Sequence, residues 1–238
     1  MIATGRSPGP DGPLLVVAPH PDDETLGCGG LIALALRRGL RVHTVFVTDG
    51  GASHPNSAAW SRQRLAERRE REAAEALRRL GAGAQPRTFL RLKDADMPAR
   101  GSPAHARAAA ALAAVLRDLS PGLALLPWRR DPHRDHRDTW RLAMDAIAAS
   151  GQAPEILEYA IWLDELGQPG DRPRAGEVEE VRVDVSAGLD AKRHAIEAHE
   201  SQLGGLITDD PTGFALGPAT VARLTGQWEV FWRPCGAR

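Results

Sequence analysis

The chain has 238 residues, of which 42% are hydrophobic and 26% are charged, which is the composition of an ordinary globular protein with one well-buried domain. Lys and Arg number 30 against 31 for Asp and Glu, so the formal net charge of -1 provides no field that would attract nucleic acid or an anionic membrane. The chain has only two cysteines, Cys28 and Cys235, which are far apart in sequence and form neither a disulfide framework nor a CxxC metal site, and no apolar run could span a bilayer, so we expect a cytoplasmic protein.

Short apolar runs alternate with helical patterns along most of the chain, which is typical of βαβ units. Residues 1–13 contain no apolar segment, and we expect a flexible leader there, followed by a single domain at 14–238. The predicted strands are 14–20, 41–50, 87–92, 122–128, 155–162 and 181–185, and the predicted helices are 24–38, 60–80, 103–119, 135–149 and 187–200. Residues 166–180 are rich in Gly, Pro and charge and are predicted to be a loop. The pattern indicates an α/β fold with a mostly parallel sheet and helices on both faces.

Polar residues gather at the points where the predicted strands end. His20 to Glu24 follow the first strand, Asp94 follows the third, and His133 to Asp138 follow the fourth. Ligands of open α/β sheets bind beyond the carboxyl ends of the strands. We therefore expect these side chains to meet in one crevice.

The residue types in this crevice are those of a metal site. The segment APHPDD places one histidine and two carboxylates beside a buried strand, where polar side chains need a partner or a metal ion. His133 and His136 lie three residues apart and share a face if their turn is helical. Two histidines and one carboxylate form a common catalytic zinc site, and we predict His20, Asp23 and His136 as the ligands of one zinc ion per chain. Alternatively, Asp22 or Asp23 could cap the following helix.

These motifs resemble those of the PIG-L or LmbE-like family of N-acetylglucosaminyl deacetylases. The family motif [A/P]HPDDE is present as His20-Pro21-Asp22-Asp23-Glu24, and HxDH as His133-Arg134-Asp135-His136. The likeness extends to TDG at 48–50, to RxxE at Arg69 and Glu72, and to KRHAIEAHESQL at 192–203. It implies an LmbE-like deacetylase domain with a Rossmann-like fold, which removes an acetyl group from an N-acetylated amino sugar or a related substrate. The resemblance also makes a homo-oligomer an expectation.

The resemblance implies roles for single residues as well. It makes His20, Asp23 and His136 the metal ligands, Asp22 the general base, and His133 the group that stabilises the oxyanion or donates a proton. Amide hydrolysis needs these functions, because water must lose a proton, the oxyanion needs stabilisation and the amine leaves protonated. The neighbouring side chains of Asp22 and Asp23 cannot point the same way, so one can hold the metal while the other faces the water. His133 could act as an imidazolium.

Three further residues are assigned to the surroundings of the metal. Asp135 could fix the tautomer of a histidine, or it could be a helix cap at the surface. Arg69 shares the apolar face of its helix with Glu72, which could be its structural partner; the family uses this arginine to contact substrate, and we expect that role. Asp94 matches an aspartate that the family places near the sugar, although an aspartate that forms a turn would look the same.

Two other functions remain open, a nucleotide-binding Rossmann-like protein and a catalytically inactive binding protein on the same fold. The segment GCGG follows the first strand, but GxGxxG would require glycine at position 32, which is Ile32. Small residues there are better explained by close packing of the helix on the sheet. The chain also lacks a P-loop and a GxSxG motif, and its intact base and ligands argue against an inactive protein.

Overall fold

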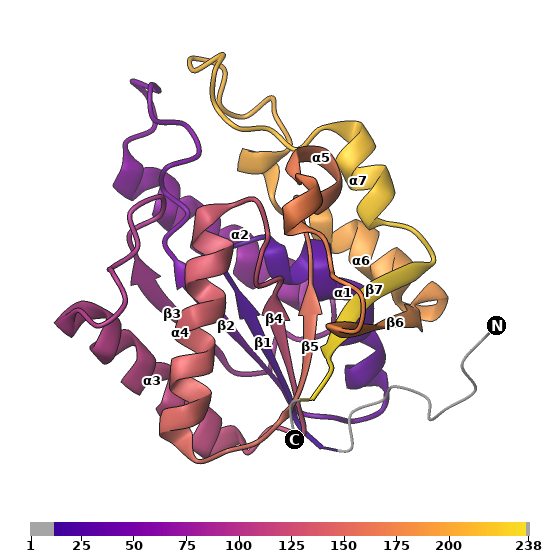
Figure 1. Ribbon diagram of the computed structural model, residues 1–238. Coiled ribbons are helices and arrows are strands. Elements are labelled where there is room, and N and C mark those ends of the chain that lie inside the picture. Colours follow the sequence, from indigo (N-terminus) through magenta and orange to yellow (C-terminus); the bar gives the residue numbers. More distant parts are fainter. Residues whose placement is uncertain (1–11, 237–238) are drawn as a thin grey trace.

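Seven strands form one sheet at the centre of the computed structural model, which describes residues 12–236 (Figure 1). The strands are β1 (Leu14–Ala18), β2 (Val42–Thr48), β3 (Arg87–Leu92), β4 (Leu123–Pro127), β5 (Glu155–Tyr159), β6 (Val178–Asp184) and β7 (Trp228–Pro234), in the order β3-β2-β1-β4-β5-β7-β6. Strands β1 to β5 pair in parallel, whereas β7 is antiparallel to both β5 and β6. The predicted α/β fold with a mostly parallel sheet is confirmed.

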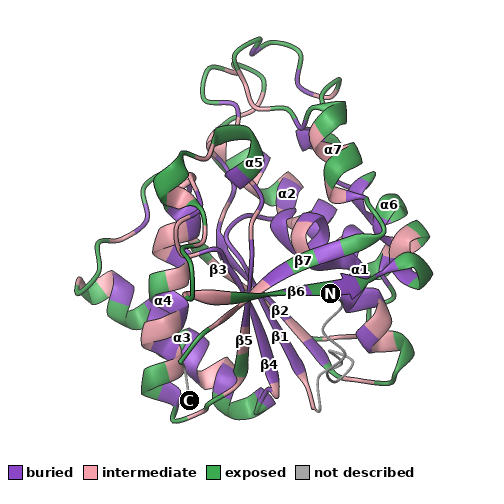
Figure 2. Ribbon diagram, turned by 45° about the vertical axis from the view of Figure 1, so that its right-hand side comes forward, coloured by how far each residue is buried: buried purple, intermediate pink, exposed green. Residues whose placement is uncertain are grey.

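Helices cover both faces of the sheet, as predicted. They are α1 (Asp23–Arg37), α2 (Arg62–Arg79), α3 (Pro103–Leu119), α4 (Arg134–Ser150), α5 (Leu163–Leu166), α6 (Leu189–Ile196) and α7 (Pro218–Leu224). Because side chains alternate along a strand, Leu14 and Val16 of β1 pack with α1, α2 and α6, while Leu15 and Val17 pack with α3 and α4. The central strands are consequently buried on both sides (Figure 2).

The glycines of the GCGG segment allow α1 to lie close to its neighbours. A Cβ atom at Gly27 would lie 2.4 Å from the Tyr159 ring, and one at Gly30 would lie 2.5 Å from Cβ of Val185. Both contacts are shorter than any packed pair of carbon atoms. The small residues here serve helix packing, as expected, and not a phosphate-binding turn.

Three predicted elements differ clearly from the structure, and in the first two a contact from outside the local sequence is the reason. The predicted strand 155–162 ends at Tyr159, because the carboxylate of Asp131 accepts hydrogen bonds from the next backbone amides and turns the chain into α5. The predicted helix 187–200 ends at Ile196, and a 3-10 turn follows in which Glu72 of α2 accepts both donors of Ser201. The predicted loop 166–180 contains a 3-10 turn and the first residues of β6.

The ends of the chain are less fully described. Of the predicted leader at 1–13, residues 1–11 lie outside the described residues, and Pro13 already accepts a hydrogen bond from the amide of Gly122. Among the described residues, no helix is long and apolar enough to cross a membrane.

Candidate metal centre and active site

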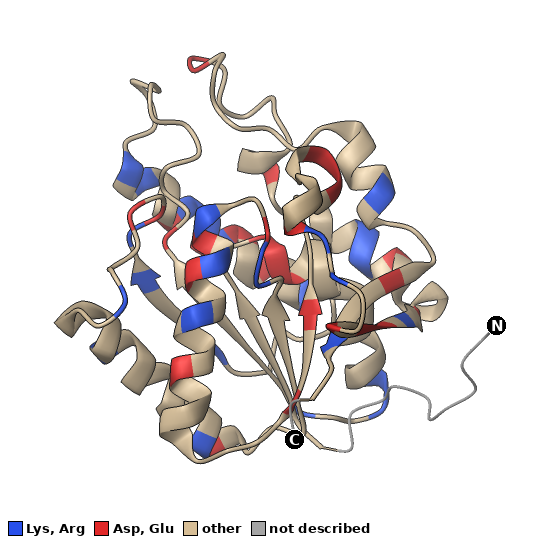
Figure 3. Cartoon of the chain, viewed as in Figure 1, with Lys and Arg blue, Asp and Glu red and all other residues tan. Residues whose placement is uncertain are grey.

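A cavity of about 400 Å³ opens at the carboxyl ends of the central strands. It is lined by most of the predicted site residues, namely His20, Asp22, Asp23, Arg69, Asp94 and His133. Asp135 and His136 are fully buried directly behind it, in contact with these side chains. Figure 3 shows acidic residues gathered above the arrowheads of the strands, where this cavity lies. The predicted convergence of the strand ends is therefore correct.

The connection between β1 and α1 holds its polar residues in a fixed loop. The amide of His20 donates to Oδ2 of Asp23 (2.9 Å), and the hydroxyl of Thr48 donates to the carbonyl of Pro19 (2.8 Å). Within residues 12–236, Asp22 makes no side-chain hydrogen bond to the first turn of α1. Asp22 thus occupies the N-cap position of α1, but its carboxylate does not cap the helix and faces the cavity.

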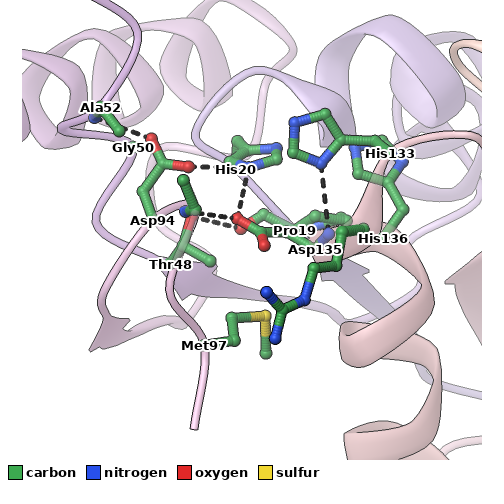
Figure 4. Close-up of polar contacts among 12 residues, drawn as sticks. Pro19, His20, Thr48, Gly50, Ala52, Asp94, Met97, His133, Asp135 and His136 are labelled. Carbon is green, nitrogen blue, oxygen red and sulfur yellow. Dashed lines mark hydrogen bonds and ion pairs between the residues drawn. The ribbon is translucent and has the colours of Figure 1, made fainter. Parts of the chain in front are cut away.

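The ring of His20 lies between carboxylates on both of its edges, and Figure 4 shows the two on one edge, those of Asp94 and Asp135. Nδ1 lies 3.1 Å from Oδ2 of Asp23, while Nε2 lies 3.3 Å from Oδ1 of Asp94 and 3.4 Å from Oδ2 of Asp135. Asp135 is itself held by the amide of Ala95 (2.7 Å). When Nε2 carries the proton and donates it to these two carboxylates, the lone pair of Nδ1 is free for a metal ion.

His136 also lies between two carboxylates, on the other side of Asp23. Its Nε2 lies 3.3 Å from the same Oδ2 atom of Asp23, and its Nδ1 lies 3.5 Å from Oδ1 of Asp131. Burial opposes the charged form of His136, but the carboxylates of Asp23 and Asp131 outweigh it and raise its pKa to about 9. Neither ring nitrogen makes a well-directed hydrogen bond within residues 12–236, which is costly for a fully buried side chain. A cation next to Nε2 would remove that cost.

The donor atoms fit a zinc site. His20, His133 and His136 each offer a nitrogen within 4.8 Å of the others, and Oδ2 of Asp23 lies within 3.3 Å of two of these rings. Nitrogen and carboxylate oxygen in this number are the ligands of catalytic zinc. The negative charge that raises the pKa of His136 is also the charge that a divalent cation would balance.

His133 has a different environment from the other two histidines. It is the residue before α4, and its Nδ1 accepts a hydrogen bond from the amide of Asp135 (3.2 Å), which leaves the proton on Nε2. Burial, followed by the positive charges of His20 and His136, lowers the pKa of His133 to about 4. The hydrogen bond to Nδ1 and the lowered pKa favour a neutral ring that donates from Nε2 at the edge of the cavity, in place of the expected imidazolium.

Arg69 forms a buried ion pair with Asp22. Its Nη2 lies 2.9 Å from Oδ2 of Asp22 and donates to the carbonyl of Pro21 (3.2 Å), while Nη1 donates to the carbonyl of Gly50 (2.9 Å). The suggested partner Glu72 is instead bound to the neighbouring arginine of α2 and to the turn after α6. Burial raises the pKa of Asp22, and the charge of Arg69 opposes this rise. The arginine therefore holds the carboxylate that lies next to the candidate metal ligands.

Comparison with known proteins assigns the chain to a family. The family model described as PIG-L: GlcNAc-PI de-N-acetylase matches residues 15–147, a span that contains both histidine motifs. The chain belongs to the PIG-L family. A Rhodococcus opacus relative, 1D-myo-inositol 2-acetamido-2-deoxy-alpha-D-glucopyranoside deacetylase, is 32% identical over 84% of this chain and 83% of its own length.

Solved structures with a similar fold belong to enzymes that are named for different reactions. N,N'-diacetylchitobiose deacetylase from Pyrococcus horikoshii is similar with a TM-score of 0.68 and 24% identity, over 93% of this chain and 83% of that one. GalB from Pseudomonas putida, a 4-carboxy-2-hydroxymuconate hydratase, has a TM-score of 0.65 and 24% identity, over 80% of each chain. At this identity the two structures show the fold alone, so the reaction of this PIG-L protein must be argued from its site.

One residue of the site was not predicted from the sequence. Asp131 is fully buried, and its carboxylate accepts hydrogen bonds from the amides of His133 (3.0 Å), Ile161 (3.2 Å) and Trp162 (3.3 Å) while it faces the ring of His136. Its position before Pro-His offered a signal, because an aspartate at the start of a turn often binds nearby amides. The contact with the chain after β5 could not be seen in the local sequence.

The rest of the cavity wall in this PIG-L protein comes from loops and short helical turns outside the two histidine motifs. The additional lining residues are Ala52, Ser53, Ala95, Trp162, Leu166, Gln202, Thr212 and Phe214. Gln202 belongs to the HESQL segment of the family resemblance. The others carry no motif, and their approach depends on how the loops fold.

Proposed function

We propose that this protein is a zinc-dependent N-deacetylase that releases acetate from an N-acetylated amino sugar. One observation carries the proposal: the carboxylate of Asp23 faces both His20 and His136, and the carboxylate of Asp22 opens into the same cavity. The relative from Rhodococcus opacus, whose name describes such a reaction, supports this reading.

His20, Asp23 and His136 would hold the zinc ion. When bound, zinc supplies a Lewis acid that polarises the amide carbonyl and makes a water molecule easier to deprotonate. Asp131 would orient His136 through Nδ1, and Asp94 with Asp135 would orient His20 through Nε2.

Asp22 and His133 would perform the proton transfer and the charge stabilisation. We assign Asp22 the role of general base, which takes the proton of the attacking water, because Arg69 fixes its carboxylate in the cavity. His133, with its proton on Nε2, would donate a hydrogen bond to the oxyanion as it forms. The proton held by Asp22 can then pass to the leaving amine.

The polar side of the cavity would bind the sugar. Arg69 and Asp94 both line it, and their hydrogen-bonding groups suit sugar hydroxyls. Asp94 is also bound to His20 and to the amide of Ala52, so its position is tied to that of the metal site.

A dinucleotide would be poorly accommodated at the same place. The pyrophosphate in Rossmann folds sits at the first helix N-terminus, where its charge meets the backbone amides. Here Asp22, Asp23 and Glu24 occupy that position with buried carboxyl groups. An inactive binding protein would have no need for the intact base and ligands.

A small glycoside is the proposed partner, and nothing in the net charge favours nucleic acid. Cys28 and Cys235 are both free thiols, which supports the expected cytoplasmic location. A homo-oligomer stays a prediction.

The proposal is tested by acetate release from a panel of N-acetylated amino sugars. We expect turnover by the zinc-loaded protein, loss of turnover after chelation and recovery with one equivalent of zinc per chain. Turnover that survives complete removal of the metal would contradict the proposal.

A further inference from the structure

One side of the catalytic cavity is apolar, in contrast to the side that carries the carboxylates. Trp162, Leu166 and Phe214 line it, and the rings of Trp162 and Phe214 meet edge to face with centroids 5.5 Å apart. Leu166 is 58% exposed, more than any other large hydrophobic side chain within residues 12–236. An exposed leucine beside an aromatic pair in a functional cavity indicates a binding surface. We call these three residues the apolar wall.

The inner end of the apolar wall is fixed to the candidate metal centre. The amide of Trp162 donates to Asp131 (3.3 Å), the same carboxylate that faces His136. The outer end is α5, whose Leu166 amide donates to the carbonyl of Trp162 (2.9 Å). Arg223 of α7 pairs with Glu165 (2.8 Å) and thereby holds α5 in place. The wall thus runs from the metal ligands to the surface on a supported backbone.

Phe214 is positioned by hydrogen bonds between two loops that project above the sheet (Figure 1). Its amide donates to the carbonyl of Ser53 (2.8 Å). Further along, the amide of Asn56 donates to Asp210 (2.9 Å). The loop at 204–217 is therefore attached to the loop that follows β2, and together they form one rim of the cavity.

The apolar wall lines the same cavity as His20, Asp22 and His133, so a substrate whose amide reaches these residues can also contact the wall. An acetyl group ends in a single methyl and cannot reach from the metal ligands to an exposed residue such as Leu166. The hydroxyls of a polyol would lose hydrogen bonds with water against such a surface.

We propose that the substrate carries an apolar aglycone, an alkyl or aryl group at the anomeric carbon of the N-acetylated amino sugar, which packs against the apolar wall. This inference rests on the proposed deacetylase function. It separates this chain from the Rhodococcus opacus relative, whose named substrate carries inositol, a polyol.

The test compares kcat/KM for acetate release from the hexyl, methyl and myo-inositol glycosides of N-acetylglucosamine. Each methylene taken out of water is worth about fourfold in binding, so contact of two or three methylenes predicts a preference for hexyl over methyl of at least about tenfold. The inositol glycoside should be no better than the methyl glycoside. Equal values for hexyl and methyl, or a preference for inositol, would overturn the inference while the deacetylase proposal stands.

A variant and a matched control locate the effect. Leu166→Ser should lower the ratio of the hexyl to the methyl value by about fourfold or more. Val230→Ser changes an exposed apolar residue of β7 that does not line this cavity, and it should leave the ratio unchanged. An unchanged ratio in Leu166→Ser would contradict the inference.

Two further outcomes would each contradict a different part of the proposal. If methyl N-hexanoylglucosaminide is hydrolysed in preference to the hexyl glycoside, the wall binds the acyl chain and the aglycone proposal is wrong. If the zinc-loaded protein releases acetate from none of the glycosides, the deacetylase proposal itself is refuted, and the inference that rests on it is overturned as well.

Discussion

The buried ion pair between Arg69 and Asp22 should contribute to both the thermal stability and the activity of the protein. Arg69→Met keeps much of the side-chain volume but removes the charge that faces the carboxylate at 2.9 Å, together with the donors to Gly50 and Pro21. Arg69 is 3% exposed and Asp22 is 5% exposed, so water from the cavity can replace the lost partner only in part. The substitution therefore leaves a buried carboxylate unpaired.

The size of the effect follows from that burial. Removal of one partner from a buried ion pair costs about 3–5 kcal/mol. For a chain of this length, where 1 kcal/mol lowers Tm by about 2–4 °C, Arg69→Met should melt about 6–20 °C below the wild type. Because Asp22 also loses its orientation, kcat/KM for acetate release should fall by about 10²-fold in the protein that remains folded.

A second substitution distinguishes this explanation from a loss of packing. In the double variant Arg69→Met with Asp22→Asn, the unpaired charge is gone, so a large part of the lost Tm should return while activity stays absent. Arg71→Met changes an exposed arginine on the same helix and is the control for both assays. Thermal unfolding and acetate release should be measured on all four proteins. If the double variant melts no higher than Arg69→Met, the unpaired carboxylate is not the cause and the reasoning is refuted.

Three other expectations concern the neighbouring residues. His136→Ala should lose zinc, whereas His133→Ala should keep it and lose about 10²–10³-fold in kcat, as for one oxyanion donor; equal zinc loss in both would contradict this division. Asp131→Asn should weaken zinc binding by about 10- to 100-fold in a competition with a chelator, because it orients His136; unchanged affinity would show that this contact is dispensable. Lys192→Met should lower the free energy of unfolding by about 3–5 kcal/mol without changing zinc content, because it leaves the buried carboxylate of Glu229 without a countercharge; a normal denaturation midpoint would contradict this.

The sequence was most informative where the site is built from residues that are close in the chain. His20, Asp22 and Asp23 occupy one loop after a strand with a clear apolar pattern, and His133 and His136 begin one helix. The period of the strands and helices placed both segments at the same edge of the sheet. A local pattern was therefore sufficient to predict that these residues meet.

The sequence was least informative where a side chain binds a distant backbone. Asp131 accepts hydrogen bonds from the amides of Ile161 and Trp162, about 30 residues further along the chain. This contact ends β5 early and starts α5. Arg69 was correctly placed facing inward, but its partner lies 47 residues earlier in the chain, so Glu72 on the same helix was the nearer candidate. The apolar wall depends on two loops whose mutual hydrogen bonds no periodic pattern encodes.

The assignment of separate tasks to two adjacent carboxylates is tested most directly by titrating zinc into Asp22→Asn and Asp23→Asn while acetate release is measured. Asn is nearly the same shape as Asp but is a poor base and a weaker, neutral ligand. We predict that Asp22→Asn binds close to one zinc per chain and is almost inactive, and that Asp23→Asn binds zinc much more weakly and recovers some activity at high zinc. An Asp22→Asn protein that turns over normally, or an Asp23→Asn protein with unchanged zinc affinity, would contradict the account.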